Sequence, residues 1–247
     1  MLKRISIIVT GLLIIAVSIA QPPKNAVNFY KNGLALRDKG MYPEAINAFK
    51  QATILYKKYD SAWLELGNLS MKLNMIDTAL WYYNKATIAN PRQVLAYIAM
   101  GNIYRDSRSS FDTAIQCYSD AMKIDSTNKV TFYSLAWCYN AKMKFDSAIY
   151  YSIRSLDIDN NYRPAYGELG HAYHASNKYK EAIEQFKKHI AKSEVDLPIY
   201  YSGMCYLELN QKDSALKMVD ALRKIGSKMA DGLQKRIDLK KPPETKN

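Results

Sequence analysis

The sequence predicts an all-α fold, a solenoid of about six helix-turn-helix units followed by a C-terminal capping helix. Two independent sets of small residues recur along the chain with the period of a helical hairpin. Gly and Pro number only 10 and 8 in 247 residues, too few for a loop-rich β-architecture. A single hairpin is too small to bury its own apolar face, so the units must stack on one another.

The repeat is defined by its two sets of small residues. The first set is an alanine spaced at intervals of 34, 35, 34, 34 and 33 residues, at Ala45, Ala79, Ala114, Ala148, Ala182 and Ala215. The second set lies about twelve residues earlier in each unit, at Gly33, Gly67, Gly101, Ala136, Gly170 and Gly203. Because two separate markers keep one period, chance is excluded as their source, and the period is that of a helical repeat.

Around these markers the chain resembles the tetratricopeptide repeat (TPR) family. The unit that begins at Asp60 fits that family's pattern best, with Trp63, Leu66, Gly67, Ala79, Tyr83, Ala86 and Pro91. The resemblance covers about residues 26–226 and implies a right-handed superhelical array of helix pairs. Three residues depart from the pattern: Ser152 and Val219 stand where an aromatic residue is usual, and His189 stands where alanine is usual.

The repeat period divides the chain into segments. We expect a signal peptide over residues 1–20, a short linker over 21–25, and a repeat array over 26–226 with units 26–59, 60–93, 94–128, 129–162, 163–195 and 196–226. Residues 227–247 should form a capping helix and a basic tail, because Met229, Leu233 and Ile237 follow helical spacing. At the start of the second helix of four units, an aspartate stands where an N-cap is expected: Asp77, Asp112, Asp146 and Asp213.

The first twenty residues have the pattern of a secretory signal. Lys3 and Arg4 precede an apolar stretch from Ile5 to Ile19, and small residues at Ser18 and Ala20 precede Gln21. The stretch is short for a membrane span, which needs about 20 residues. We therefore expect a periplasmic or secreted bacterial protein. The alternative is an uncleaved N-terminal membrane anchor, the only way in which we expect this chain to meet a membrane.

Charge and cysteine content limit the function classes. The formal net charge is +12, but it includes a basic C-terminal tail, and no long Lys/Arg run occurs, so we expect no nucleic-acid partner. The three cysteines, Cys117, Cys138 and Cys205, form no CxxC pair. We interpret them as small buried residues, with a disulfide between neighbouring repeats as the alternative.

No catalytic or cofactor-binding motif occurs in the sequence. There is no phosphate-binding glycine loop, no G-x-S-x-G and no H-E-x-x-H. Glu168, His171 and His174 share one side of a predicted helix and would begin a metal site if a second helix added ligands. No convincing donors stand at the matching positions, so we predict no metal, no cofactor and no catalytic residue. A metal-dependent enzyme is the less favoured alternative.

The resemblance implies a concave groove lined by the first helix of each unit, where such proteins bind peptides or partner helices. On the helical face that lies away from the packing positions, the candidate partner-binding residues are Tyr30, Arg37, Asn68, Asn102, Arg105, Tyr133, Trp137, Asn140, His171 and His174. Asn68 and Asn102 occupy a position where a groove asparagine often binds a peptide backbone. The alternative is that asparagine is merely common there.

The sequence thus predicts an extracytoplasmic adaptor without enzymatic activity. Its partner would be a protein or peptide of the cell envelope. A sensory or regulatory input module that acts in trans is the alternative, since similar arrays occur in signalling proteins.

Overall fold

The computed structural model describes residues 21–190 and 195–240, and within these ranges every element of secondary structure is a helix. The predicted signal peptide and the end of the predicted basic tail lie outside the described residues. In chain order the helices are α1 (Lys24–Asp38), α2 (Tyr42–Leu55), α3 (Asp60–Lys72), α4 (Ile76–Ala89), α5 (Val94–Asp106), α6 (Phe111–Ile124), α7 (Lys129–Ala141), α8 (Phe145–Ile158), α9 (Arg163–Ala175), α10 (Tyr179–Ile190), α11 (Asp196–Glu208), α12 (Lys212–Lys224) and α13 (Met229–Leu239).

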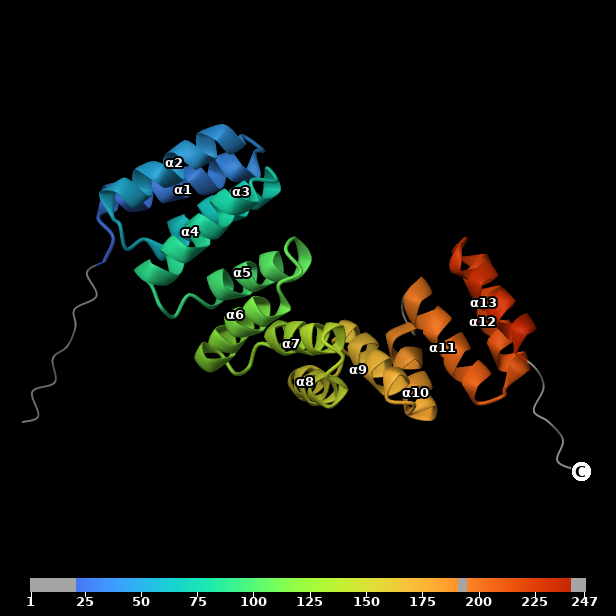
Figure 1. Ribbon diagram of the computed structural model, residues 1–247. Coiled ribbons are helices and arrows are strands. Elements are labelled where there is room, and N and C mark those ends of the chain that lie inside the picture. The colour runs from blue at the N-terminus through green and yellow to red at the C-terminus, as the bar shows by residue number, and fades with distance from the viewer. Residues whose placement is uncertain (1–20, 191–194, 241–247) are drawn as a thin grey trace, which may run out of the picture.

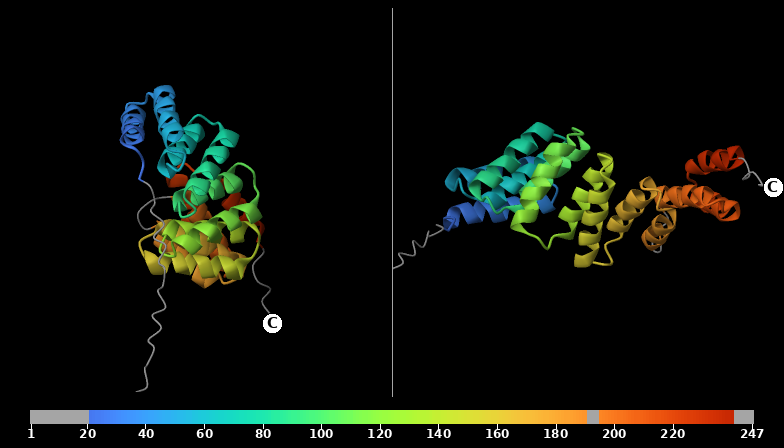
Figure 2. Two further views of the ribbon diagram at one scale, coloured as in Figure 1. Left: turned by 90° about the vertical axis from the view of Figure 1, so that its left-hand side faces the viewer. Right: turned by 60° about the horizontal axis from the view of Figure 1, so that its bottom comes forward.

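The helices form consecutive hairpins that follow one another along a curved path. Figure 1 shows the path from α1 and α2 at one end to α12 and α13 at the other, and the same order is visible in the right-hand view of Figure 2. The predicted fold class, an all-α solenoid of helical repeats with a capping helix, is confirmed. Helix α1 begins at Lys24, so the segment before the first repeat is shorter than the predicted linker of 21–25.

Successive repeats touch mainly where the second helix of one repeat packs on the first helix of the next, as α8 packs on α9 and α10 on α11, and first helices also contact one another. Helices α5, α7 and α9 each contact the first helix of the repeat that follows, namely α7, α9 and α11. First helices approach one another across repeats more closely than second helices do, so in the described part of the chain the first helices lie on the inner side of the curve. We call the side formed by α1, α3, α5, α7, α9 and α11 the concave face.

Within a repeat, a small residue of the first helix faces an aromatic ring of the second. A methyl group on Gly101 would lie 2.6 Å from the ring of Tyr118, too close for any real side chain. The same relation joins Gly33 to Phe49, Gly67 to Tyr83 and Gly170 to Phe186. The recurring glycines are therefore packing positions, where the ring of the second helix needs the space of a side chain.

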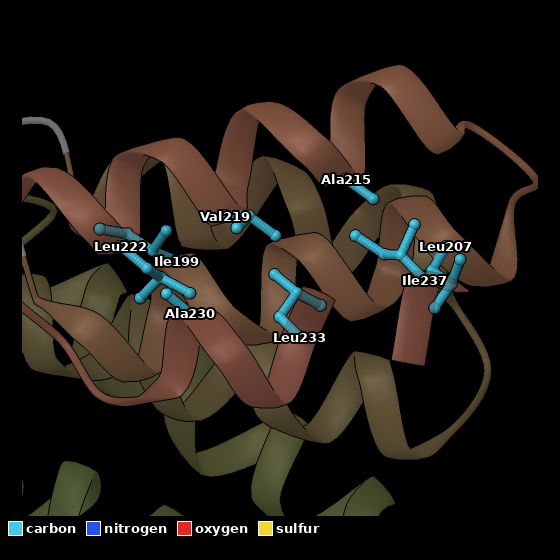
Figure 3. Close-up of a cluster of buried hydrophobic side chains, with 8 residues drawn as sticks. All are labelled: Ile199, Leu207, Ala215, Val219, Leu222, Ala230, Leu233 and Ile237. Atoms are coloured by element: carbon cyan, nitrogen blue, oxygen red, sulfur yellow. The ribbon is translucent and has the colours of Figure 1, made fainter. Parts of the chain in front are cut away.

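The sixth repeat lacks an aromatic ring at this position and is completed by the capping helix. Val219 replaces the ring, and the side chain that faces Gly203 is Leu233 of α13. Figure 3 shows Leu233 and Ile237 among the buried side chains of α11 and α12. Both are almost fully buried, so α13 closes the apolar end of the array that would otherwise face water.

The predicted N-caps are wrong. The four aspartates are the second residue of α4, α6, α8 and α12, and the capping residues are Met75, Ser110, Lys144 and Gln211, none of which makes a side-chain cap bond. Negative charge in a first turn is nevertheless favourable, because the amino end of a helix is partly positive. Asp77 also pairs with Arg108, and Asp112 with Lys142, each from the following repeat.

The cysteines are free, and two of the three fit the prediction. Cys138 and Cys205 are buried, whereas Cys117 is only half-buried. Burial raises the pKa of Cys138 and Cys205 to about 12 and that of Cys117 to about 11, so the thiols stay protonated and weakly nucleophilic near neutral pH. Among the described residues, no helix is both long and apolar enough to cross a bilayer.

Candidate binding groove

One hollow of the concave face lies between repeats four, five and six. It has a volume of about 430 Å³ and is lined by residues of α7, α9, α10 and α11 and of the segment before α11. Its apolar walls include Trp137, Phe186, Leu197, Pro198 and Tyr201, and its polar side chains include Asn140, Glu168, His171, His189 and Asp196. We call this hollow the Glu168 pocket.

The pocket exists because repeat five lacks a large side chain at one position of its first helix. The equivalent residues of the other repeats are Tyr30, Leu64, Ile98, Tyr133 and Tyr200, whereas repeat five has Gly167. A methyl group on Gly167 would lie 2.8 Å from Nδ1 of His189. His189 replaces the usual alanine, so its ring takes part of the space that Gly167 leaves, and the rest remains open as the pocket.

Glu168 supplies a half-buried carboxyl group to this pocket. The side-chain amide Nδ2 of Asn140 donates to Oε2 of Glu168 at 2.8 Å and to the backbone carbonyl of Glu168 at 3.0 Å. Burial raises the pKa of Glu168 to about 7, although the hydrogen bond from Asn140 and the charge of Arg105 both lower it. A carboxyl group that titrates near neutral pH and is fixed by an amide is poised to respond to a bound charge.

Two histidines lie against the same space. Nδ1 of His171 and Nδ1 of His189 are buried and have no hydrogen-bond partner. Burial lowers the pKa of both imidazoles, so they are neutral near pH 7. The ring of His171 packs edge-on against Tyr201, with 5.4 Å between ring centroids. No group of three or more potential metal ligands comes together in the described ranges 21–190 and 195–240.

Trp137 and Tyr133 form the wall toward repeat three. Trp137 packs against Phe111 with 5.8 Å between ring centroids, and the guanidinium of Arg105 lies 5.2 Å from the Trp137 ring. Tyr133 packs edge-on against Tyr162, and burial raises the pKa of Tyr133 to about 12. Both rings are held by neighbouring rings, so they offer rigid apolar surface to a ligand.

The structure brings four of the predicted groove residues into this pocket: Tyr133, Trp137, Asn140 and His171. Arg37 and Asn68 line a second, shallower hollow of about 610 Å³ near the first turn, where Nη1 of Arg37 pairs with Oε2 of Glu65 at 2.9 Å. Tyr30 packs on Phe49 and Tyr59, and His174 packs on Tyr179 and Tyr201. Six of the ten predicted residues therefore line one or the other of these two hollows, and Tyr30, Asn102, Arg105 and His174 line neither.

Two of the predicted contact residues already make hydrogen bonds to other residues of the protein. Asn140 is only 6% exposed and supports Glu168, so it is not a surface anchor for a partner. Arg105 donates to both oxygens of Asp106, at 2.6 and 2.8 Å, and its side chain is 15% exposed. We correct the prediction that these two residues are free to bind a partner. Arg105 instead supports the Trp137 ring.

Sequence reasoning missed several residues that shape the pocket. It considered Glu168 only as a metal ligand, and it did not select Gly167, Asp196 or Tyr201. The available signals were the exceptions within the repeat: a glycine where every other unit has a large residue, and His189 where alanine is usual. Two such departures from the repeat pattern, close together in one repeat, indicate a place where the helices leave an open cavity.

Comparison with known proteins agrees with the repeat architecture. Residues 30–94 and residues 164–190 each match a family model described as tetratricopeptide repeat. Among curated proteins, the chain is 28% identical over 122 residues to the photosystem I assembly protein Ycf3 of Prochlorococcus marinus (strain MIT 9301). That match covers 43% of this chain and 70% of the relative.

Solved structures share the fold at low sequence identity. PilW, a type IV pilus biogenesis factor, has a TM-score of 0.71 and 16% identity, and the match covers 85% of this chain and 99% of PilW. YrrB, described as a TPR protein with an unusual peptide-binding site, has a TM-score of 0.66 and 22% identity, with 76% and 98% covered. At these identities the likeness shows the fold alone.

Proposed function

The chain carries tetratricopeptide repeats, and from this premise we propose that it binds a peptide segment of a partner protein along its concave face, over the Glu168 pocket. The observation that carries the proposal is the pocket itself, with its rigid aromatic walls at the junction of repeats four to six. Buried aromatic anchors near the centre of a surface supply most of the free energy of protein binding. Assembly factors and peptide-binding proteins among the similar chains support the same class of function.

We propose that the activity of this site is binding rather than catalysis. Ser, Thr, Cys and Lys, four of the side-chain types that serve as covalent nucleophiles, are absent from the residues that line the pocket. The three thiols stay protonated near neutral pH. The imidazoles of His171 and His189 are held neutral by burial, which suits a wall of a binding site.

We further propose that the protein acts outside the cytoplasm, in the cell envelope. The support is the sequence pattern of residues 1–20, two basic residues followed by an apolar stretch and small residues before Gln21. The mass of the mature protein isolated from fractionated cells tests this. Cleavage after Ala20 is expected, and a retained segment in a membrane fraction would favour the anchored alternative.

The binding proposal is tested by affinity capture with matched tryptophan variants. Purified wild-type protein, Trp137→Ala and Trp81→Ala are immobilised, and the proteins that each retains from the envelope fraction of the source cells are quantified. Trp81 is a suitable control because it is 52% exposed on α4 and does not line the pocket. A specific partner should be retained by wild type and Trp81→Ala and lost with Trp137→Ala. Equal retention by all three would refute binding over the pocket.

A further inference from the structure

The Glu168 pocket contains hydrogen-bond acceptors that the protein itself leaves unsatisfied. Oε2 of Glu168 accepts a hydrogen bond from Nδ2 of Asn140, and Oε1 can accept one from a ligand. Asn140 has both of its amide hydrogens directed to Glu168, while its own Oδ1 is buried without a partner. An unpaired buried acceptor is costly, typically about 1–3 kcal/mol, so a ligand that donates hydrogen bonds here would be favoured.

The charged groups around the pocket also favour a ligand that donates hydrogen bonds, and in particular a positively charged one. Asp196 contributes a second carboxylate to the lining, accepting from the backbone of Leu197 and from Ser227. Arg105 is the cation whose charge acts on Glu168, and its guanidinium is paired with Asp106. The two carboxyl groups therefore face the cavity without an unpaired cation among the residues that line it.

The apolar walls suit the stem of a long cationic side chain. Trp137, Tyr133 and Tyr201 present aromatic surface around the cavity, and ring faces attract ammonium and guanidinium groups. A lysine or arginine side chain buries its methylene groups along such a surface while its charged end reaches a carboxylate. The cavity volume of about 430 Å³ is ample for one such side chain.

We propose that the Glu168 pocket receives one positively charged side chain, the ammonium of a lysine or the guanidinium of an arginine, from the peptide that occupies the concave face. This inference rests on the proposed function and specifies its partner's chemistry. An acidic side chain would meet the carboxyl groups of Glu168 and Asp196, and an uncharged apolar one would offer them neither a hydrogen-bond donor nor an opposite charge. The overall charge of +12 does not oppose this, because charges beyond a Debye length of about 8 Å are screened at physiological salt.

Binding of a cation should depend on pH through Glu168. Because its pKa is about 7, the carboxyl is partly protonated at neutral pH, and a cation binds more tightly as the carboxylate forms. The charge of Arg105 from α5 acts on Glu168, Glu168 acts on Tyr133 and Cys138 from α7, and His171, His189 and Asp196 line the same pocket. Affinity should therefore increase from pH 6 to pH 8, and Glu168→Gln should remove this increase.

Small side-chain analogues test the inference without any partner protein. The probes are n-butylammonium and n-butylguanidinium, with neutral n-butanol and anionic pentanoate as comparisons. Binding is followed by NMR through the indole N–H of Trp137, one of three tryptophans in the chain, assigned with Trp137→Phe. Both cations should give saturable shifts, weakened at least tenfold by Glu168→Gln. Glu181→Gln is the matched control, since Glu181 is exposed at the start of α10 and should not change affinity.

Two results would overturn the inference. One is that n-butanol or pentanoate binds as tightly as the cations, and the other is that Glu168→Gln leaves the cation affinity unchanged. Failure of the proposed function would look different, since the capture experiment would then retain no partner through Trp137 whatever these probes do. Thermal melting of Glu168→Gln checks that the variant is folded.

Discussion

The phenolic oxygen of Tyr118 donates a hydrogen bond of 2.7 Å to Oδ1 of Asn102 across the two helices of repeat three. The same bond joins Tyr83 to Asn68 in repeat two, at 2.9 Å. Repeats one and five have Phe49 and Phe186 instead of tyrosine, and the facing residues are Leu34 and His171. Asparagine thus occurs where the ring carries a hydroxyl that needs an acceptor, which is a packing reason for Asn68 and Asn102.

Tyr118→Phe should therefore destabilise the protein by about 1 kcal/mol, because the buried pair loses a hydrogen bond and Asn102 loses its donor. Urea denaturation of Tyr118→Phe, of Asn102→Leu and of the double variant Tyr118→Phe/Asn102→Leu measures this. The second substitution should recover part of the loss, since it removes the unpaired acceptor. Independent, additive effects of the two substitutions would contradict the pairing.

Gly101→Leu should destabilise the array by about 1–3 kcal/mol, because its first carbon alone would lie 2.6 Å from the Tyr118 ring. Gly232→Ala in α13 is the matched control. Nothing lies within 4 Å of a methyl group at Gly232, so that variant should be stabilised by up to about 1 kcal/mol through helix propensity. The stabilities come from chemical denaturation. A Gly101→Leu protein as stable as wild type would show that the helix packing is wrong.

Met143→Gly should stabilise the protein by about 1 kcal/mol. Met143 has a φ of 57° in the turn between α7 and α8, a left-handed conformation that costs a non-glycine residue about 1–2 kcal/mol. The equivalent residues of the other repeats also have positive φ; Gly40, Asn74, Asn177 and Asn210 are types that tolerate it, whereas Ser109, with a φ of 49°, is not. Met75→Gly is the control, since its φ of −95° gains nothing from glycine. A destabilised Met143→Gly would contradict the turn conformation.

The stability of Glu168→Gln should exceed that of wild type above pH 7 and match it near pH 4.5. The folded pKa is raised to about 7 from 4.5, so the folded state binds more protons than the unfolded state between these values. The contribution of Glu168 to the free energy of unfolding is fully present below pH 4.5. It is lost as the pH rises through 7, and the loss amounts to about 3 kcal/mol. Denaturation of wild type and variant between pH 4.5 and 8 tests this. Parallel pH profiles would show that Glu168 titrates normally.

The repeat architecture could be predicted because it follows from a period that every unit obeys. The glycine of the first helix faces an aromatic ring of the second helix, as Gly67 faces Tyr83, and the same pair recurs in other repeats. A single sequence therefore contained several independent examples of this packing. The capping helix was predictable from its own spacing, because Leu233 and Ile237 lie on one face of a helix and must be buried against the last repeat.

The binding site could be predicted only in part, because it depends on departures from the period. Tyr133, Trp137 and His171 were selected by their face on the helix, and the structure does bring them to one pocket. The angular position of a residue does not show whether its polar atoms are already paired, as the guanidinium of Arg105 and Nδ2 of Asn140 are. Nor does it show the open volume, which results from Gly167 and His189 together.

The most direct measurement of the central claim is the dissociation constant of the captured partner for wild type, Trp137→Ala and Trp81→Ala, determined by calorimetry at one salt concentration. If the partner binds the concave face over the Glu168 pocket, Trp137→Ala should weaken binding about 30-fold, equivalent to about 2 kcal/mol, whereas Trp81→Ala should leave it unchanged. If Trp81→Ala weakens binding and Trp137→Ala does not, the partner binds the opposite side of the solenoid, and the claim is wrong.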